Sequence, residues 1–362
     1  MKNQANTPPT RDNRYDYLDN LKWLLTILVI LHHAAAVAGL DPTGFNLAPV
    51  ALQYQWQYNT LIKFQGDNQS YFMGLFFFLS ALFVVPSFHK KGYSKFISDK
   101  FKRLGIPTLI FPFIILPFIS YSSAIDNIKK FLATGNINLG VTWFCWTLIV
   151  FNLIWLFVTF LFNDNKSPKE PKQIPKMRKI TLFASILVPI SYAALGLENI
   201  LGENFFGLHL IKYFPMYIVM FYFGIKTYEN KWLEQIELKH AFYGIIIWYL
   251  SRNFLSPIFN GYGMNYDMAS NSFSSIGMTM FLVYIFKQLF NHTTKFTIIM
   301  SRTAFAAYVW QVLILYLVAK YLHPFITEMP LVNFVIIGIP SVILSFGMGY
   351  IICKLPLMKN IF

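Results

Sequence analysis

Two ionisable residues in the first apolar stretch are candidates for chemistry, Lys22 and His33 in LDNLKWLLTILVILHHAAA. A helix rises about 1.5 Å per residue, so their spacing of 11 residues separates them by roughly 16 Å, or about half of a hydrocarbon core of about 30 Å. Steps of about 100° also bring both side chains within about 20° of one helical face. This spacing predicts a cation at the membrane rim directly below an imidazole near the midplane.

An imidazole with a pKa near neutrality can accept the proton of a hydroxyl group. Because ionisable side chains inside a membrane are costly, each is a functional candidate by default. We therefore interpret His33 as a candidate base, with a structural, hydrogen-bonded histidine as the alternative. His32 points about 100° away and is expected to pack or to orient its neighbour.

The elements that must position these residues are membrane helices. The chain has 362 residues, of which 56% are hydrophobic and only 13% charged, and this composition excludes an ordinary cytosolic enzyme and a disulfide scaffold. We predict an all-α, polytopic membrane bundle of ten spans, over residues 21–40, 69–86, 104–121, 141–163, 179–196, 209–225, 241–256, 274–290, 297–319 and 331–353. The third span carries Pro107, Pro112 and Pro117, so it should be kinked, with its freed carbonyls bonded to neighbouring helices.

The charge distribution predicts the orientation of these spans. Of the 30 Lys and Arg residues, 24 fall in segments that the ten spans assign to the cytoplasmic side. We therefore expect a cytoplasmic tail over 1–20, a ten-helix domain over 21–353 and a cytoplasmic tail over 354–362. The net charge of +14 then encodes topology rather than binding to nucleic acid, and no cleavable signal is expected. The scattered histidines predict no metal site.

Several motifs resemble those of one family in order along the chain. The run RYDYLDNLKWLLTILVILHHA resembles the opening of the acyltransferase family 3 membrane proteins, in which an arginine, ten residues and a catalytic histidine follow one another. Lys22 occupies the arginine position and His33 the histidine position. Four more matches are FFFLSALFV (76–84, similar to FFxxSG), FISDKFKRLGIP (96–107), GVTWFCWTLIV (140–150, similar to G-x-x-WF-x-x-x-L) and YFPMYIVMFYFGI (213–225). SRTAFAAYVWQVLIL (301–315) resembles the family's S-x-x-x-Y-x-x-H helix, with Gln311 in place of histidine.

The resemblance implies transfer of an acyl group, most often acetyl, from cytoplasmic acyl-CoA to a hydroxyl of an extracytoplasmic acceptor at the plasma membrane. The acceptor would be a surface glycan or a lipid-linked sugar, and acyl-CoA would be a co-substrate rather than a bound cofactor. His33 would be catalytic, and the cationic residues Lys22, Lys100 and Arg103 would bind the donor's phosphates, although lipid contact is the alternative for the basic segment 90–103. The candidate wall of the site comprises Ser80, Trp143, Tyr308 and Gln311.

Two departures from the family pattern leave other functions open. Lys22 lacks the planar fork of arginine, and Gln311 cannot titrate. The alternatives to an acyltransferase are a transporter or flippase and a non-catalytic scaffold. Outer-side residues 54–58 and 260–273 are weaker candidates for glycan contact, because interfacial aromatic residues are usually membrane anchors. Glu198, Glu203 and His209 are expected in a solvated loop. Arg252 should either snorkel to the membrane interface or pair with a carboxylate that the sequence does not identify.

Overall fold

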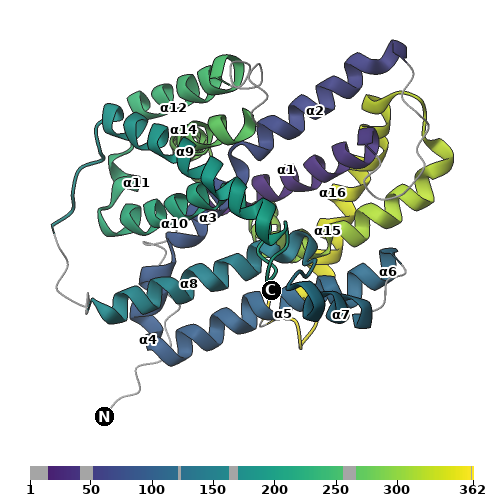
Figure 1. Cartoon of the computed structure of the whole chain (residues 1–362), viewed down its shortest axis with the longest axis horizontal. Coiled ribbons are helices and arrows are strands. Elements are labelled where there is room, and N and C mark those ends of the chain that lie inside the picture. The colour runs from purple at the N-terminus through teal and green to yellow at the C-terminus, as the bar shows by residue number, and fades with distance from the viewer. Residues whose placement is uncertain (1–14, 41–51, 121–123, 163–169, 256–265, 360) are drawn as a thin grey trace.

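The computed structural model describes residues 15–40, 52–120, 124–162, 170–255, 266–359 and 361–362. Within these ranges the regular elements are helices, and the β-type interaction present is one isolated antiparallel bridge between Asn136 and Phe205. The prediction of an all-α protein is confirmed (Figure 1).

Seven helical stretches in the described part of the chain are long and apolar enough to cross a membrane. They are Asp16–Ala38, Val84–Ser120, Gly140–Leu161, Met177–Leu201, Met268–Leu289, Lys295–Phe325 and Pro330–Lys354. Each of the ten predicted spans contains or overlaps a helix, but α3 (Phe72–Ala81), α10 (Phe214–Glu229) and α12 (Leu238–Leu250) have only 10, 16 and 13 residues. The chain is thus a multi-pass helical membrane protein, while the count of ten and the location of the termini stay predictions.

The proline-rich third span is interrupted by two π-helical turns, as its prolines require. The helix α4 (Val84–Lys100) continues through a π turn at Phe101–Gly105, α5 (Ile106–Ile110), a second π turn at Phe111–Ile115 and α6 (Leu116–Ser120). Pro112 lacks the N–H that would bond to the carbonyl of Thr108, and the Thr142 hydroxyl donates to that carbonyl at 3.3 Å. A neighbouring segment therefore satisfies the freed carbonyl, as predicted.

Three shorter helices had no counterpart among the predicted spans: α2 (Gln55–Gln69), α7 (Ala124–Thr134) and α11 (Trp232–Gln235). On α7, the apolar Ile125 and Leu132 are exposed, and Asn127 is buried where its amide donates to the Pro112 carbonyl at 3.1 Å. An amphipathic helix with an uncovered apolar face is typical of a segment lying in the membrane interface. Hydropathy did not indicate these helices, because none of them is an apolar run of membrane length.

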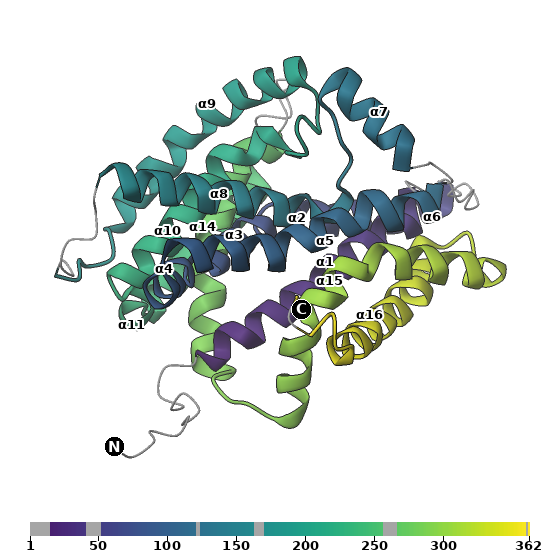
Figure 2. The ribbon, with the colours of Figure 1, turned by 90° about the horizontal axis from the view of Figure 1, so that it is seen from below.

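The helices α1 (Asp16–Leu40), α15 (Lys295–Leu322) and α16 (Pro330–Lys354) pack against one another on one side of the molecule (Figures 1 and 2). Two glycines of α16 permit this close packing. A Cβ atom at Gly349 would lie 2.8 Å from the carbonyl oxygen of Thr303 on α15, and one at Gly338 would lie 3.1 Å from Leu31 on α1. We call the interface of these three helices the α1–α15–α16 seam.

The remaining long helices are α8 (Trp143–Leu161), α9 (Met177–Leu201) and α14 (Tyr266–Leu289), which pack with α3, α10 and α12 around the main core. Phe77 is fully buried there and stacks on Tyr217, with ring centroids 4.9 Å apart. Ala81, which stands where the family motif has glycine, faces a glycine on α10, because a Cβ at Gly224 would lie 2.6 Å from the Ala81 Cβ. The close approach of α3 and α10 is therefore kept.

Candidate functional site

The helix α1 carries both residues of the leading sequence hypothesis without interruption. Lys22 forms an ion pair with Asp19 at 3.5 Å, and its Nζ lies 4.1 Å from the centre of the Phe83 ring, just before α4. The His33 ring is partly buried and lies edge-on to the His32 ring, with centroids 5.3 Å apart. His32 packs on Phe72 of α3 at 5.2 Å, which agrees with the packing role expected for it.

Two apolar clusters fix the register of the α1–α15–α16 seam. The first contains Ile30, Ala304, Ala307 and Phe346, and the second contains Ala34, Val37, Ile314, Leu315 and Ile337. On α1, His33 falls between the residues of the two clusters; on α15, Gln311 falls between them. Within a helix, the residues of each cluster recur at the spacing of one helical face. Because His33 and Gln311 each lie between the two clusters, they lie at the same level of the seam.

Polar groups without partners gather at this level. Gln311 is fully buried, and neither its amide nitrogen nor its oxygen has a hydrogen-bond partner in the described part of the chain. Ser341 and Ser345 on α16 are also fully buried, and their hydroxyls have no partner within the same ranges. Both serines lie between Ile337 and Phe346, which belong to the two apolar clusters. We call His33, Gln311, Ser341 and Ser345 the polar layer.

The polar layer brings unpaired donors and an imidazole to one level of the seam. An unsatisfied buried polar group costs about 1–3 kcal/mol, so four such atoms in one interface are unfavourable unless a ligand uses them. Amide and hydroxyl donors can hold a carbonyl or alkoxide oxygen, while an imidazole at the same level can accept a proton. Sequence reasoning missed Ser341 and Ser345. Their spacing of four residues, which places both on one face of a helix, is the pattern that could have indicated them.

The candidate wall residues divide between two places. Tyr308 is buried one turn from Gln311 on α15, and its hydroxyl donates to the backbone carbonyl of Val141, which joins α15 to the segment before α8. Trp143 begins α8, as predicted, and lies in an aromatic cluster 5.9 Å from Tyr217. Ser80 is partly buried near the end of α3. Only Tyr308 and Gln311 therefore come from a helix of the seam.

The basic segment lies along α4 and the π turn that follows it. The Nζ atom of Lys100 lies 5.1 Å from the centre of the Phe96 ring, and the residue is partly buried, whereas Arg103 is exposed. Residues three positions apart, as Lys100 and Arg103 are, share one face of a regular α-helix. The π turn at Phe101–Gly105 changes that spacing, because its hydrogen bonds run over five residues rather than four.

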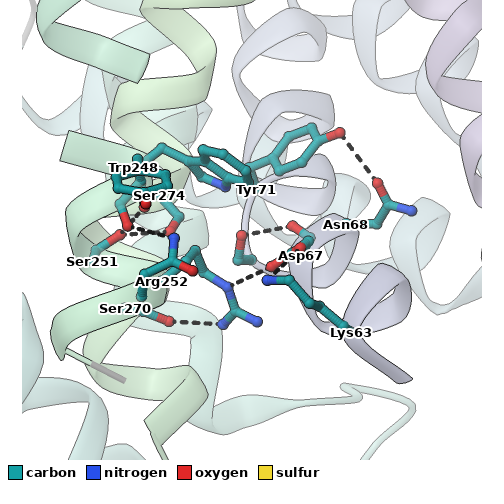
Figure 3. Close-up of polar contacts among 12 residues, drawn as sticks. Lys63, Asp67, Asn68, Tyr71, Trp248, Ser251, Arg252, Ser270 and Ser274 are labelled. Atoms are coloured by element: carbon teal, nitrogen blue, oxygen red, sulfur yellow. Dashed lines mark hydrogen bonds and ion pairs between the residues drawn. The ribbon is translucent and has the colours of Figure 1, made fainter. Parts of the chain in front are cut away.

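The partner of Arg252 is Asp67 on α2, 185 positions away in the chain. The guanidinium donates through Nε to Asp67 Oδ1 at 3.0 Å and through Nη1 to the Ser270 hydroxyl at 3.1 Å (Figure 3). Lys63 also contacts Asp67, at 3.3 Å. Of the two alternatives that the sequence left open for Arg252, the structure shows the carboxylate pair. The sequence could not identify Asp67, because only the fold brings α2 to the π turn at Ser251–Leu255.

The expectation of a solvated loop for Glu198 is wrong. Glu198 is 3% exposed near the end of α9, and its carboxylate pairs with the Lys212 ammonium at 3.3 Å and accepts from the Lys212 backbone N–H at 3.0 Å. His209 lies in the connection between α9 and α10, and its ring packs on Trp143 at 5.7 Å. This burial lowers the pKa of His209 below 6.5. The two side chains therefore help to close this end of the core.

The weaker glycan candidates have mixed outcomes. Gln57 is buried, and its side-chain oxygen accepts from the Leu331 backbone N–H at 3.1 Å, so it joins α2 to α16. Trp56 beside it is 61% exposed. Of the predicted loop 260–273, residues 260–265 lie outside the described residues, and the rest begins α14.

An apolar cavity of about 80 Å³ lies apart from the polar layer, among α3, α9, α10, α11, α12 and α14. Phe78 lines it from α3, whereas Phe72 of the same helix faces His32. Six helical positions of about 100° separate these two residues by roughly 240°, so they occupy different faces of α3. We assign this cavity no part in the chemistry of the seam.

Comparison with known proteins gives one match. The sequence model described as an acyltransferase domain, of acyltransferase family 3, matches residues 15–350, which is nearly the whole chain and includes every candidate residue above. No curated protein and no solved structure matches the chain.

Proposed function

The chain belongs to acyltransferase family 3, and from this premise we propose that it transfers an acyl group, acetyl in the simplest case, from acyl-CoA to a hydroxyl of a carbohydrate or lipid-linked sugar outside the cytoplasm. The family and the apolar helices make it a membrane acyltransferase. The donor, the acceptor, the plasma-membrane location and the base belong to the proposal.

In this proposal His33 is the general base. Its neutral imidazole takes the proton of the acceptor hydroxyl as the oxygen attacks the thioester carbonyl carbon. The carbon–sulfur bond then breaks, and the departing CoA thiolate takes the proton back from the imidazolium. Each turnover thus leaves the histidine as it began, and no redox partner or metal is needed to balance the step.

The polar layer is the observation that supports this assignment best. The negative charge that develops on the thioester oxygen needs donors held in advance, and the Gln311 amide and the Ser341 and Ser345 hydroxyls are donors without partners in the described residues. They lie at the level of His33, between the two apolar clusters of the seam. Water would be scarce there, which protects the thioester from hydrolysis.

The donor would approach from the basic side of the protein. CoA carries phosphates, and Lys22, Lys100 and Arg103 are cations on α1, on α4 and in the π turn after it. Lys22 shares its helical face with His33, so it could hold the donor at the rim while the acyl group reaches the imidazole. A lysine makes a single-point contact with phosphate rather than a bidentate one.

A paired substitution on α1 tests the proposal. We expect His33→Gln to lower acyl transfer from radiolabelled acetyl-CoA by about 100-fold or more, since general base catalysis contributes about 10²–10⁴. The matched control is His32→Gln, one residue away in the same helix, which should retain transfer. Mass spectrometry of surface glycans and lipids should show one component that loses an acyl mass in the His33→Gln cells.

The opposite outcome would favour the other two hypotheses. If the purified protein neither hydrolyses nor transfers from acetyl-CoA, and His33→Gln cells keep every acylated component, the chain is a transporter, a flippase or a scaffold. Thermal unfolding of both variants in detergent shows whether each is folded.

A further inference from the structure

A second group of buried polar residues lies where α2 meets the π turn at Ser251–Leu255 and α14 (Figure 3). Arg252, with only 7% of its side chain exposed, is held by Asp67 and Ser270. Gly66 leaves room for the guanidinium, because a Cβ atom there would lie 2.9 Å from Arg252 Nη2. We call Asp67, Asn68, Arg252, Ser270 and Asn271 the α2–α14 cluster.

Buried amide atoms in this cluster have no partner in the described part of the chain. Asn68 is 5% exposed; its oxygen accepts from the Tyr71 hydroxyl at 3.2 Å, but its Nδ2 has no acceptor. Asn271 is 4% exposed, and its Oδ1 has no donor. The Ser272 hydroxyl beside it is also unpaired and fully buried. Asn68 Nδ2 is thus available to a ligand as a donor and Asn271 Oδ1 as an acceptor, and the Ser272 hydroxyl can act as either.

The cluster lies on one side of His33, away from the basic end of α1. Asn20 near the start of α1 donates to the carbonyls of Phe290 and His292, which anchors the first turns of α1 at the far end of α14 from Asn271. On α14, the Ser275 hydroxyl, one turn from Asn271, donates at 2.9 Å to the carbonyl of Ser70, the residue that follows α2. The Gln65 amide also donates to the His32 carbonyl at 3.1 Å, which ties α2 to this part of α1.

From this placement we infer that the α2–α14 cluster is the acceptor subsite, and that it binds the hydroxyl groups of an uncharged polyhydroxylated molecule. This inference rests on the proposed function. A hydroxyl both donates and accepts, so neighbouring hydroxyls can satisfy Asn68 Nδ2 and Asn271 Oδ1 together. The buried Arg252 charge is already matched by Asp67, and the second cation at this carboxylate, Lys63, has 64% of its side chain exposed and is screened by water, which favours an uncharged ligand over an anion.

The acceptor itself can serve as the probe before its identity is known. Cells carrying His33→Gln should accumulate it unmodified, so their glycan and lipid extract supplies the substrate for assays with radiolabelled acetyl-CoA and the purified full chain. We expect Asn68→Leu and Asn271→Leu each to raise the acceptor KM about tenfold, the effect of losing one hydrogen bond. The KM for acetyl-CoA, kcat at saturating acceptor and the slow hydrolysis of acetyl-CoA should stay within twofold of the wild type.

Thr279→Val is the matched control on the same helix. Thr279 is buried on α14, and its hydroxyl donates to the Ser275 carbonyl at 2.7 Å, two turns from Asn271. Its acceptor KM should not change. If Asn271→Leu does not fold, Asn271→Ser, which keeps an oxygen acceptor, should raise the KM by a smaller factor.

Three results would overturn the inference, and they are distinguishable. An unchanged acceptor KM in the Asn68 and Asn271 variants, with His33→Gln still inactive, removes the subsite but leaves the proposed function. An acceptor KM that rises steeply with salt shows an anionic ligand and removes the assignment of an uncharged one. Full acylation in His33→Gln cells removes the proposed function and, with it, the subsite.

Discussion

Replacing Gln311 with methionine should stabilise the protein while lowering its activity. The substitution Gln311→Met keeps the length of the side chain and removes the amide nitrogen and oxygen. Both atoms are buried on α15 without a partner in the described residues, and each such group costs about 1–3 kcal/mol. In a membrane the unfolded chain also finds partners, which reduces the gain per group to about 0.6–1.7 kcal/mol. We therefore expect a stabilisation of about 2 kcal/mol, or roughly 30-fold in the ratio of folded to unfolded protein.

Equilibrium unfolding of the purified protein by titration with SDS measures this change. Thr303→Val is the control on the same helix, because Thr303 is also buried but its hydroxyl donates to the Ile299 carbonyl at 2.9 Å. Losing a satisfied bond should be neutral or destabilising by up to about 1 kcal/mol. Gln311→Met should therefore raise the unfolding midpoint, whereas Thr303→Val should leave it unchanged or lower it.

Acyl transfer by the same two variants tests the functional part of the reasoning. We expect Gln311→Met to lose at least tenfold in transfer, as removal of one oxyanion donor does in other enzymes, and Thr303→Val to keep it. A destabilised Gln311→Met would show that the amide has partners, contrary to its description as unsatisfied. A stabilised but fully active variant would refute the role of the polar layer in binding the reacting group.

Three further predictions concern packing and charge. Gly349→Ala should lower the free energy of unfolding by about 1–3 kcal/mol in the same SDS titration, because its Cβ would lie 2.8 Å from the Thr303 carbonyl oxygen. The control Gly347→Ala, whose Cβ would have no atom within 4 Å, should be neutral or slightly stabilising. Asp67→Asn should destabilise the protein by about 3 kcal/mol through the buried Arg252, whereas removing the exposed Lys63 pair should cost less than about 1 kcal/mol. His209 has a pKa lowered by burial, so folding favours its neutral form, and the stability it contributes is present above pH 6.5 and is lost as the pH falls below that value. The melting temperature of the wild type should therefore fall further between pH 7 and pH 5.5 than that of His209→Gln.

The membrane character, the helical class and the main candidate residue could all be predicted from local patterns. Apolar runs of membrane length define α1, α8, α9, α15 and α16, since every backbone polar group in a bilayer must be satisfied within a helix. The kinked third span followed from three prolines. The short helices α2 and α7 could not be predicted in this way, because hydropathy responds only to segments that are long enough to cross.

The sequence by itself determined that this is a multi-pass helical membrane protein with a histidine 11 residues from a cation on one helical face. Helical periodicity is a property of one segment, so it needs no neighbours. Tertiary structure alone decided that His33 lies level with Gln311 and the two serines of α16, and that Arg252 pairs with Asp67 on α2. These groups are far apart in the chain, and the spacing of residues within one helix carries no information about which residue of another helix will lie opposite.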